Sequence, residues 1–197
     1  MGVINSGFGG WPRSGDPRLP PGQTLAEDWP VLTAGPTPDI DEHEWSFTIT
    51  TESGIEHRWD WSGLLAAGVE EIVTDIHCVT HWSKLDMPWR GVPVERLFED
   101  VDTSYDYVMV ESYGGYTTNL ALDDLFDGQA WIAIEAEGEP LIPEHGGPAR
   151  LLVPHLYFWK SAKWVRGMRM MSDDEPGFWE QNGYHLRGDP WLEERYW

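Results

Sequence analysis

The single cysteine of this chain lies between two histidines. His77 and Cys78 are adjacent and His81 follows, in the run TDIHCVTHWSKLDMPWRGVP over residues 74–93. Thiolate sulfur and imidazole nitrogen are ligands for soft and borderline metals, and a thiolate beside an imidazole is also a candidate nucleophile. Because the 197 residues include one cysteine, no internal disulfide can form and any thiol chemistry must use Cys78.

Two metal sites can be considered from these residues. A structural zinc site needs four ligands, but neighbouring residues on a strand, such as His77 and Cys78, point to opposite faces. A blue-copper site takes two histidines, one cysteine and a weak axial methionine, and Cys78, His81, Met87 and His43 offer that set. The charged side chains in the same run are unfavourable for copper, because the surroundings of its sulfur ligand are usually apolar.

Two further interpretations need no metal. An imidazolium at His81 would favour the thiolate of Cys78, which could then act as a catalytic nucleophile with an orienting acid or amide elsewhere. Alternatively, Cys78 is an inert thiol packed at the end of a strand. The residues around the cysteine leave these alternatives open.

The elements expected to position Cys78 are short and mostly extended. The β-branched run over residues 70–79 predicts a strand that leads into the cysteine. Ser62 is the expected N-terminal cap of a helix over 62–69. We expect further strands at 44–51, 55–61, 105–112 and 131–138, a loop with a short strand at 114–120, small helices at 94–101 and 122–126, and two strands around a polar bend at 160–163. The pattern predicts an α+β fold of many short strands with small helices.

The chain is expected to form one domain preceded by an arm. Residues 1–38 are rich in glycine and proline and lack periodicity, which predicts an extended N-terminal arm. Residues 39–197 contain neither a repeat nor a linker, which predicts a single domain. We find no apolar run long enough for a membrane span and no secretory signal pattern, and therefore expect a cytoplasmic protein.

The charge balance limits the possible partners. A net charge of -21 makes nucleic acid or an anionic membrane an unsuitable partner, since binding polyphosphate requires clustered Lys and Arg. An acidic, lysine-poor surface suits a salt-rich cytoplasm, so we expect a halophilic protein. Lys160 and Lys163 are two of only three lysines, the third being Lys84, and their proximity predicts an anion near the bend.

Four blocks of the sequence resemble the sulfite oxidase superfamily of molybdopterin enzymes. They are HCVTHWSKLDMPWRGVPVERLF at 77–98, YVMVES at 107–112, GEPLIPEHGGPARLLVPHLYFWKSAKWV at 138–165 and DEPGFWEQNGYH at 174–185. The likeness covers roughly residues 30 to 190 and is nearest to the catalytic subunit of bacterial methionine sulfoxide reductase and its small single-domain relatives. It implies a sulfite-oxidase-type molybdopterin-binding fold.

The resemblance also implies a metal ligand. Cys78 matches the cysteine whose thiolate binds molybdenum in that family, where a pterin dithiolene and oxo groups complete the coordination. His77 and His81 would then be catalytic pocket groups that donate hydrogen bonds to an oxo ligand or to substrate. The expected cofactor-binding residues are Cys78, Ser112, His145, Arg150, Ser161, Lys163 and, from the arm, Thr33.

The function implied is that of a mononuclear molybdenum oxidoreductase. It would transfer an oxygen atom to or from a small, sulfur-containing substrate and exchange electrons through a separate carrier, because one cysteine cannot supply a CxxCH haem motif. The arginine cluster that binds sulfite in sulfite oxidases is not visible around Cys78. The alternatives are a cupredoxin-like electron-transfer protein using Cys78, His81, Met87 and His43, and a cofactor-free binding module.

Overall fold

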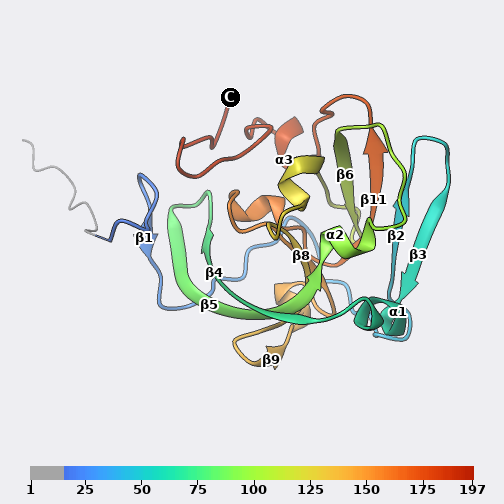
Figure 1. Cartoon of the computed structure of the whole chain (residues 1–197). Coiled ribbons are helices and arrows are strands. Elements are labelled where there is room, and N and C mark those ends of the chain that lie inside the picture. Colours follow the sequence, from blue (N-terminus) through green and yellow to red (C-terminus); the bar gives the residue numbers. More distant parts are fainter. Residues whose placement is uncertain (1–15) are drawn as a thin grey trace, which may run out of the picture.

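The computed structural model describes residues 16–197, which contain two β-sheets and a few short helices (Figure 1). The five-stranded sheet has the order β3-β2-β11-β6-β7, formed by β2 (Ser46–Thr50), β3 (Glu56–Asp60), β6 (Tyr107–Ser112), β7 (Thr117–Ala121) and β11 (Val165–Met171). The six-stranded sheet has the order β1-β5-β8-β10, with β4 on β5 and β9 on β8. Its strands are β1 (Thr24–Leu25), β4 (Glu70–His77), β5 (Trp82–Pro93), β8 (Trp131–Ala136), β9 (Glu139–Pro140) and β10 (Arg150–Leu152).

The helices are all short. They are α1 (Trp61–Ala66), α2 (Val94–Leu97) and α3 (Phe178–Gln181), with 3₁₀ helices at Leu122–Leu125, Pro143–His145 and Phe158–Lys160. The expected fold of many short strands with small helices is confirmed. Within residues 16–197, no helix is long and apolar enough to cross a membrane.

The main hydrophobic core lies between the two sheets. Phe47 and Ile49 of β2 and Ile132 and Ile134 of β8 are buried in the same cluster. Side chains alternate along a strand, so Trp131 and Ala133 point to the opposite face of β8, where a second cluster forms. The six-stranded sheet is therefore buried on both faces around its centre.

The prediction that Ser62 caps the first helix was wrong. The helix begins one residue earlier, and Oδ1 of Asp60 accepts the hydrogen bond from the Gly63 N–H at 2.7 Å. A carboxylate at this position also interacts favourably with the positive end of the helix dipole. Ser62 supports the cap indirectly, because its hydroxyl donates to the same Asp60 oxygen at 2.8 Å.

The run after the cysteine is a strand, which the expected elements did not include. Strand β5 pairs with β4 and β8, and Met87 and Trp89 alternate with exposed residues along it. The sequence does not predict this strand because aspartate and proline interrupt the strand pattern. Asp86 has a positive φ of 53°, and Pro88 lacks an N–H. Asp75 accepts the Asp86 N–H at 2.8 Å beside an irregularity in β4.

The described part of the arm, residues 16–38, passes the turn between β4 and β5, pairs with the start of β5 and continues to Lys163, which donates to the Leu32 carbonyl. Strand β1 pairs in parallel with the start of β5, with Thr24 opposite Trp82 and Leu25 opposite Ser83. In Figure 1 this segment is the blue trace beside β5. Residues 1–15 lie outside the described part of the chain, so the predicted boundary between arm and domain stays a prediction.

Candidate active site

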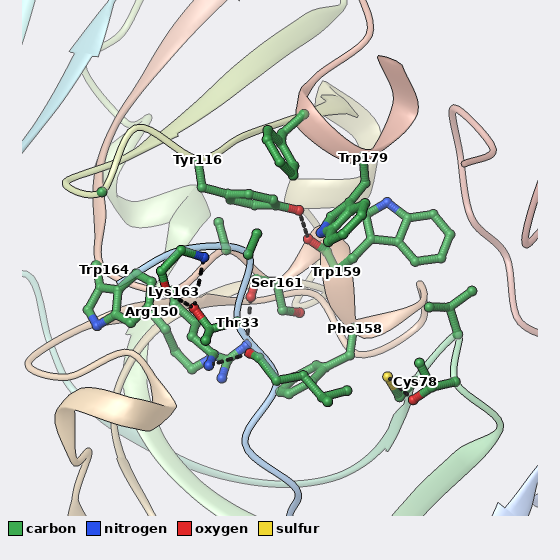
Figure 2. A pocket seen from close by; sticks show the side chains of 18 of the residues that line it. Thr33, Cys78, Tyr116, Arg150, Phe158, Trp159, Ser161, Lys163, Trp164 and Trp179 are labelled. Carbon is green, nitrogen blue, oxygen red and sulfur yellow. Dashed lines mark hydrogen bonds between the residues drawn. The ribbon is translucent and has the colours of Figure 1, made fainter. Parts of the chain in front are cut away.

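A cavity of about 400 Å³ connects Cys78 with the bend that precedes β11. Figure 2 shows Cys78 on one side of this cavity and Lys163 and Arg150 on the opposite side, with Phe158 between them. Much of the wall is aromatic. The aromatic lining residues include Trp29, Trp82, Tyr116, Trp159, Trp179 and Tyr184.

Cys78 occupies the turn that joins β4 to β5. Its N–H donates to the Trp82 carbonyl at 2.8 Å, and the His81 N–H donates to the Cys78 carbonyl at 3.1 Å. The side chain lines the cavity although the residue is only 6% exposed, and its sulfur lies 3.1 Å from the Thr80 hydroxyl. Burial raises the pKa of the Cys78 thiol, against the opposing effect of the Thr80 hydrogen bonds. A free thiol in this state is a weak nucleophile.

The structure brings neither flanking histidine to the cavity lining. His77 is buried, and its Nδ1 lies 2.8 Å from the Ser83 hydroxyl. Burial lowers the pKa of His77, so its imidazole is neutral at pH 7. His81 directs its Nδ1 to the Gly22 carbonyl at 3.0 Å, so it does not pair with Cys78 as the nucleophile interpretation required. The catalytic roles of His77 and His81 stay predictions.

The residues of the copper interpretation are not assembled. Met87 packs with Ile76 and Trp89 in a cluster that does not include Cys78. His43 lines a different cavity of about 510 Å³, together with the acidic side chains of residues 39–44. Within the part of the chain that the structure describes, no group of three or more His, Cys, Asp or Glu side chains could hold a metal ion.

The far end of the cavity carries two close positive charges. Lys163 Nζ donates to the Leu32 carbonyl at 2.7 Å and to the Glu144 carbonyl at 2.6 Å. Arg150 is buried and donates to the carbonyls of His145 at 2.9 Å and Ser161 at 2.6 Å.

The electrostatics of these two cations favour an anion. Burial lowers the pKa of Arg150 to about 9. Burial and, next, the charge of Arg150 lower the pKa of Lys163 to about 8. An anion bound here would offset the repulsion and raise both values, since an opposite charge favours the protonated form. Perturbed groups of this kind in a cavity are typical of binding sites.

Lys160 does not belong to this end of the cavity, so the prediction from paired lysines was partly wrong. Its Nζ lies 2.7 Å from Glu180 Oε1 in a fully buried ion pair. It also donates to the backbone and side-chain oxygens of Asn119 at 2.8 and 2.9 Å. The 3₁₀ helix at Phe158–Lys160 directs this side chain toward β7. Arg150, not Lys160, accompanies Lys163.

Two other predicted cofactor-binding residues line the cavity. Ser161 accepts the Val153 N–H at 2.9 Å, which leaves its hydroxyl proton available as a donor. Thr33 comes from the arm, and its hydroxyl donates to the Gly35 carbonyl at 2.8 Å. The arm therefore forms one wall of the cavity.

Ser112 and His145, also predicted to bind the cofactor, do not line the cavity. The buried Ser112 hydroxyl oxygen has no hydrogen-bond partner within residues 16–197. His145 stacks on Trp29 with ring centroids 3.7 Å apart. Burial, followed by the charges of Arg150 and Lys163, lowers the pKa of His145 to about 4, so the ring is neutral at pH 7.

Sequence reasoning missed the aromatic wall. Tyr116 donates its hydroxyl proton to the Trp159 carbonyl at 2.6 Å, and Trp159 donates its indole N–H to Glu180 at 2.8 Å. Tyr184 stacks on Trp179 at 4.9 Å. The signal was the aromatic segment around residues 178–197 in a chain with 13 tryptophans, but composition does not indicate which rings face a cavity.

Comparison with known proteins decides the family. Residues 34–179 match the model of the oxidoreductase molybdopterin binding domain, which is most of the chain. This chain belongs to that family, the sulfite oxidase family of molybdopterin-binding oxidoreductases. The resemblance seen in the four sequence blocks is thereby confirmed, and so is the expectation of an enzyme.

Three similar proteins place this molybdopterin-binding oxidoreductase among its relatives. It is 41% identical over 182 residues to the uncharacterized oxidoreductase YuiH of Bacillus subtilis (strain 168), covering 91% of this chain and 92% of the relative. It is 25% identical to the protein-methionine-sulfoxide reductase catalytic subunit MsrP of Gluconobacter oxydans (strain 621H), covering 78% of this chain and 57% of MsrP. The structure of the sulfane dehydrogenase SoxCD from Paracoccus pantotrophus shares the fold, with a TM-score of 0.63 and 17% identity over 75% of this chain and 42% of SoxCD.

The cavity of this molybdopterin-binding domain fits the group that its family implies. Molybdopterin is elongated, with sulfur donors for molybdenum at one end and a phosphate at the other. Cys78 offers a soft thiolate at one end of the cavity, and Lys163 and Arg150 offer positive charge at the opposite end. Ser161 lies beside the charged end, with an O–H available to a phosphate or to the pterin edge.

Proposed function

We propose that this chain is a mononuclear molybdenum oxidoreductase that transfers an oxygen atom to or from a small sulfur compound. The observation that carries the proposal is one cavity with the only thiol of the chain at one end and two cations at the other. When bound, the cofactor supplies a metal that exchanges an oxygen atom with substrate and stores two electrons.

The residues of the chain would bind and orient the cofactor and exclude water from the cavity. Cys78 would provide the protein ligand to molybdenum. Lys163 and Ser161 would hold the phosphate or the pterin edge. Arg150 would add positive charge to this end of the cavity, and it fixes the carbonyls of His145 and Ser161. Around Cys78, the rings of Trp159 and Tyr184 displace water and strengthen electrostatic interactions within the cavity.

The lining favours a neutral sulfoxide over sulfite as substrate. Near Cys78 the wall is formed by rings such as Trp82, Trp179 and Tyr184, whereas both cations of the lining, Arg150 and Lys163, lie at the other end. An apolar pocket accepts a neutral substrate more readily than a dianion, whose desolvation is costly. The relative MsrP is named a methionine-sulfoxide reductase. Reduction would consume two electrons and two protons and release a thioether and water.

The experiment compares the two substrates directly. We expect reduction of methionine sulfoxide with a chemical electron donor to exceed sulfite oxidation with a chemical acceptor by at least about tenfold in kcat/KM. Steady-state kinetics with protein that contains molybdenum measures both. Equal or greater sulfite oxidation would contradict the assignment to sulfoxides.

The cellular setting is also part of the proposal. Electrons would come from a separate carrier protein, because one cysteine permits no CxxCH haem site in these residues. A cytoplasmic location can be tested by cell fractionation.

The acidic surface supports a halophilic character. With a net charge of -21, self-repulsion opposes the compact state at low ionic strength. We expect the melting temperature to rise between about 0.15 M and about 2 M KCl, beyond the range in which screening of simple ion pairs saturates. A flat or falling melting temperature over this range would contradict the halophilic interpretation.

A further inference from the structure

The turn that carries Cys78 is held by side chains from both ends of the described chain. Arg195 Nη1 donates to the Val79 carbonyl at 2.7 Å, across 116 positions of sequence. Gln23 Nε2 donates to the Cys78 carbonyl at 3.0 Å. Both donors are buried, with Gln23 5% exposed and Arg195 7% exposed. The two consecutive carbonyls at the cysteine are thus fixed by partners remote in sequence.

The turn itself needs such support. His81 has a φ of 72°, in the left-handed region that is unfavourable for residues with a Cβ. Such conformations persist where surrounding contacts determine them. Thr24 contributes by donating its N–H and hydroxyl to the His81 carbonyl, each at 2.9 Å.

Further contacts hold the Arg195 side chain in place beside the cysteine turn. Its guanidinium lies over the ring of Tyr157, 4.9 Å from the centroid, and its Nη2 donates to the Pro21 carbonyl at 3.3 Å. The backbone around Arg195 runs antiparallel to residues 184–185. A β-bridge joins Tyr184 and Tyr196, and the His185 N–H donates to the Arg195 carbonyl at 3.2 Å. The C-terminal segment therefore contacts the cavity wall and the cysteine turn together.

These donors lie outside the residues that the family model matches. The family model matches residues 34–179, whereas Gln23 precedes that region and Arg195 follows it. Residues 34–179 supply the thiol, and the segments on either side of them contribute donors to the turn that presents it.

We propose that Arg195 and Gln23 are positioning residues that fix the carbonyls of Val79 and Cys78 and thereby aim the Cys78 sulfur into the cavity. The inference rests on the proposed function only in taking Cys78 as the metal ligand. Neither residue lines the cavity, so both act through the turn and do not touch the cofactor.

The test begins with protein prepared without cofactor, in which Cys78 is the only thiol. Arg195→Met keeps the length of the side chain and removes its hydrogen bonds and charge. We expect alkylation of the thiol by iodoacetamide and amide hydrogen exchange of residues 78–82 to become at least about tenfold faster, because losing a hydrogen bond to a charged group favours local opening by about that factor. Arg195→Lys should restore part of the protection.

The matched control is Arg187→Met, in the same segment. Arg187 is half exposed and pairs with Asp124, so alkylation and exchange at the turn should stay as in the wild type. Gln23→Leu provides a second perturbation from the opposite end of the chain, which keeps the test informative if Arg195→Met folds poorly. In protein loaded with cofactor, kcat should fall by about tenfold or more in Gln23→Leu and Arg195→Met, with KM little changed.

Unchanged alkylation and exchange at 78–82 in both Arg195→Met and Gln23→Leu would overturn the inference. Because these readouts use cofactor-free protein, they are independent of the proposed function. A protein that binds no molybdenum but shows the faster exchange would refute the proposed function and retain the support of the turn. If the protein binds molybdenum but the variants show no change at the turn, the proposed function is retained and the positioning role of Arg195 and Gln23 is refuted.

Discussion

The Cys78→Ser variant is expected to lose oxygen-transfer activity to below about 1% of the wild type, because loss of a direct ligand should exceed the 10- to 100-fold cost of outer-shell substitutions. A hydroxyl is a poor ligand for a soft, thiolate-binding metal site. The fold should survive, since serine occupies a similar volume and can keep the contact with the Thr80 hydroxyl. Turnover, bound molybdenum and thermal unfolding measured on the same preparation separate these effects.

The control for this prediction is Thr80→Val, which removes the hydroxyl 3.1 Å from the sulfur and leaves the thiol in place. It should retain cofactor and most of its turnover. The melting temperature of Cys78→Ser should stay within about 4 °C of the wild type, as expected for a change of about 1 kcal/mol. Full activity in Cys78→Ser would show that the thiolate is not the metal ligand, and global unfolding would favour an inert structural cysteine.

The Lys163→Ala variant is expected to retain the cofactor about 10- to 100-fold less tightly. A hydrogen bond to a charged group contributes about 1.5–3 kcal/mol, and each 1.4 kcal/mol corresponds to a factor of ten in affinity. The Leu32 carbonyl also loses its donor, which loosens the arm over the cavity. Bound molybdenum per chain after extended dialysis measures the loss.

Lys84→Ala is the matched control for Lys163→Ala. Lys84 is another of the three lysines, but it pairs with Glu137 at 2.7 Å and does not line the cavity. This variant should keep both cofactor and activity. Equal occupancy in the two variants would mean that the bend before β11 is ordinary surface.

The pH dependence provides a second measurement on Lys163. The pKa of Lys163 in the empty protein is about 8, so its amine loses charge as the pH rises through that value. A bound anion raises this pKa, so binding takes up a proton above pH 8 and retention should weaken as the pH rises further. Lys163→Arg should flatten this dependence because arginine stays charged.

The same shift affects the stability of the empty protein in the opposite direction. Between about pH 8 and the ordinary lysine pKa of 10.5, the unfolded chain binds a proton at Lys163 that the folded chain does not. This group therefore makes the free energy of unfolding increase with pH over that window. Weaker retention there cannot be attributed to the effect of Lys163 on the fold.

The sequence predicts those strands that have a regular local pattern of side chains. The β-branched run at 70–77 predicts the strand that ends at Cys78, and alternation predicts β2, β3 and β8, because side-chain period and burial are local signals. It fails at β5, where Asp86 and Pro88 interrupt the pattern although pairing on both sides maintains the strand.

Site residues could be predicted from the sequence where the residue type determines the chemistry. They could not be predicted where the role depends on the direction in which a side chain points. Cys78, Arg150 and Lys163 were identified and lie around one cavity. Lys160 was misassigned because a side chain on a 3₁₀ helix can turn to either side, and only the position of Glu180 reveals which. The contact of Arg195 with Val79 spans 116 positions and leaves no local trace.

The content of molybdenum per chain tests the central claim most directly. The protein should be purified from a host that makes the cofactor and analysed for molybdenum, copper and zinc together with an assay for released pterin. The account predicts about one molybdenum and one pterin per chain. Stoichiometric copper would favour the electron-transfer alternative, and a protein that contains neither metal nor pterin in such a host would contradict the account.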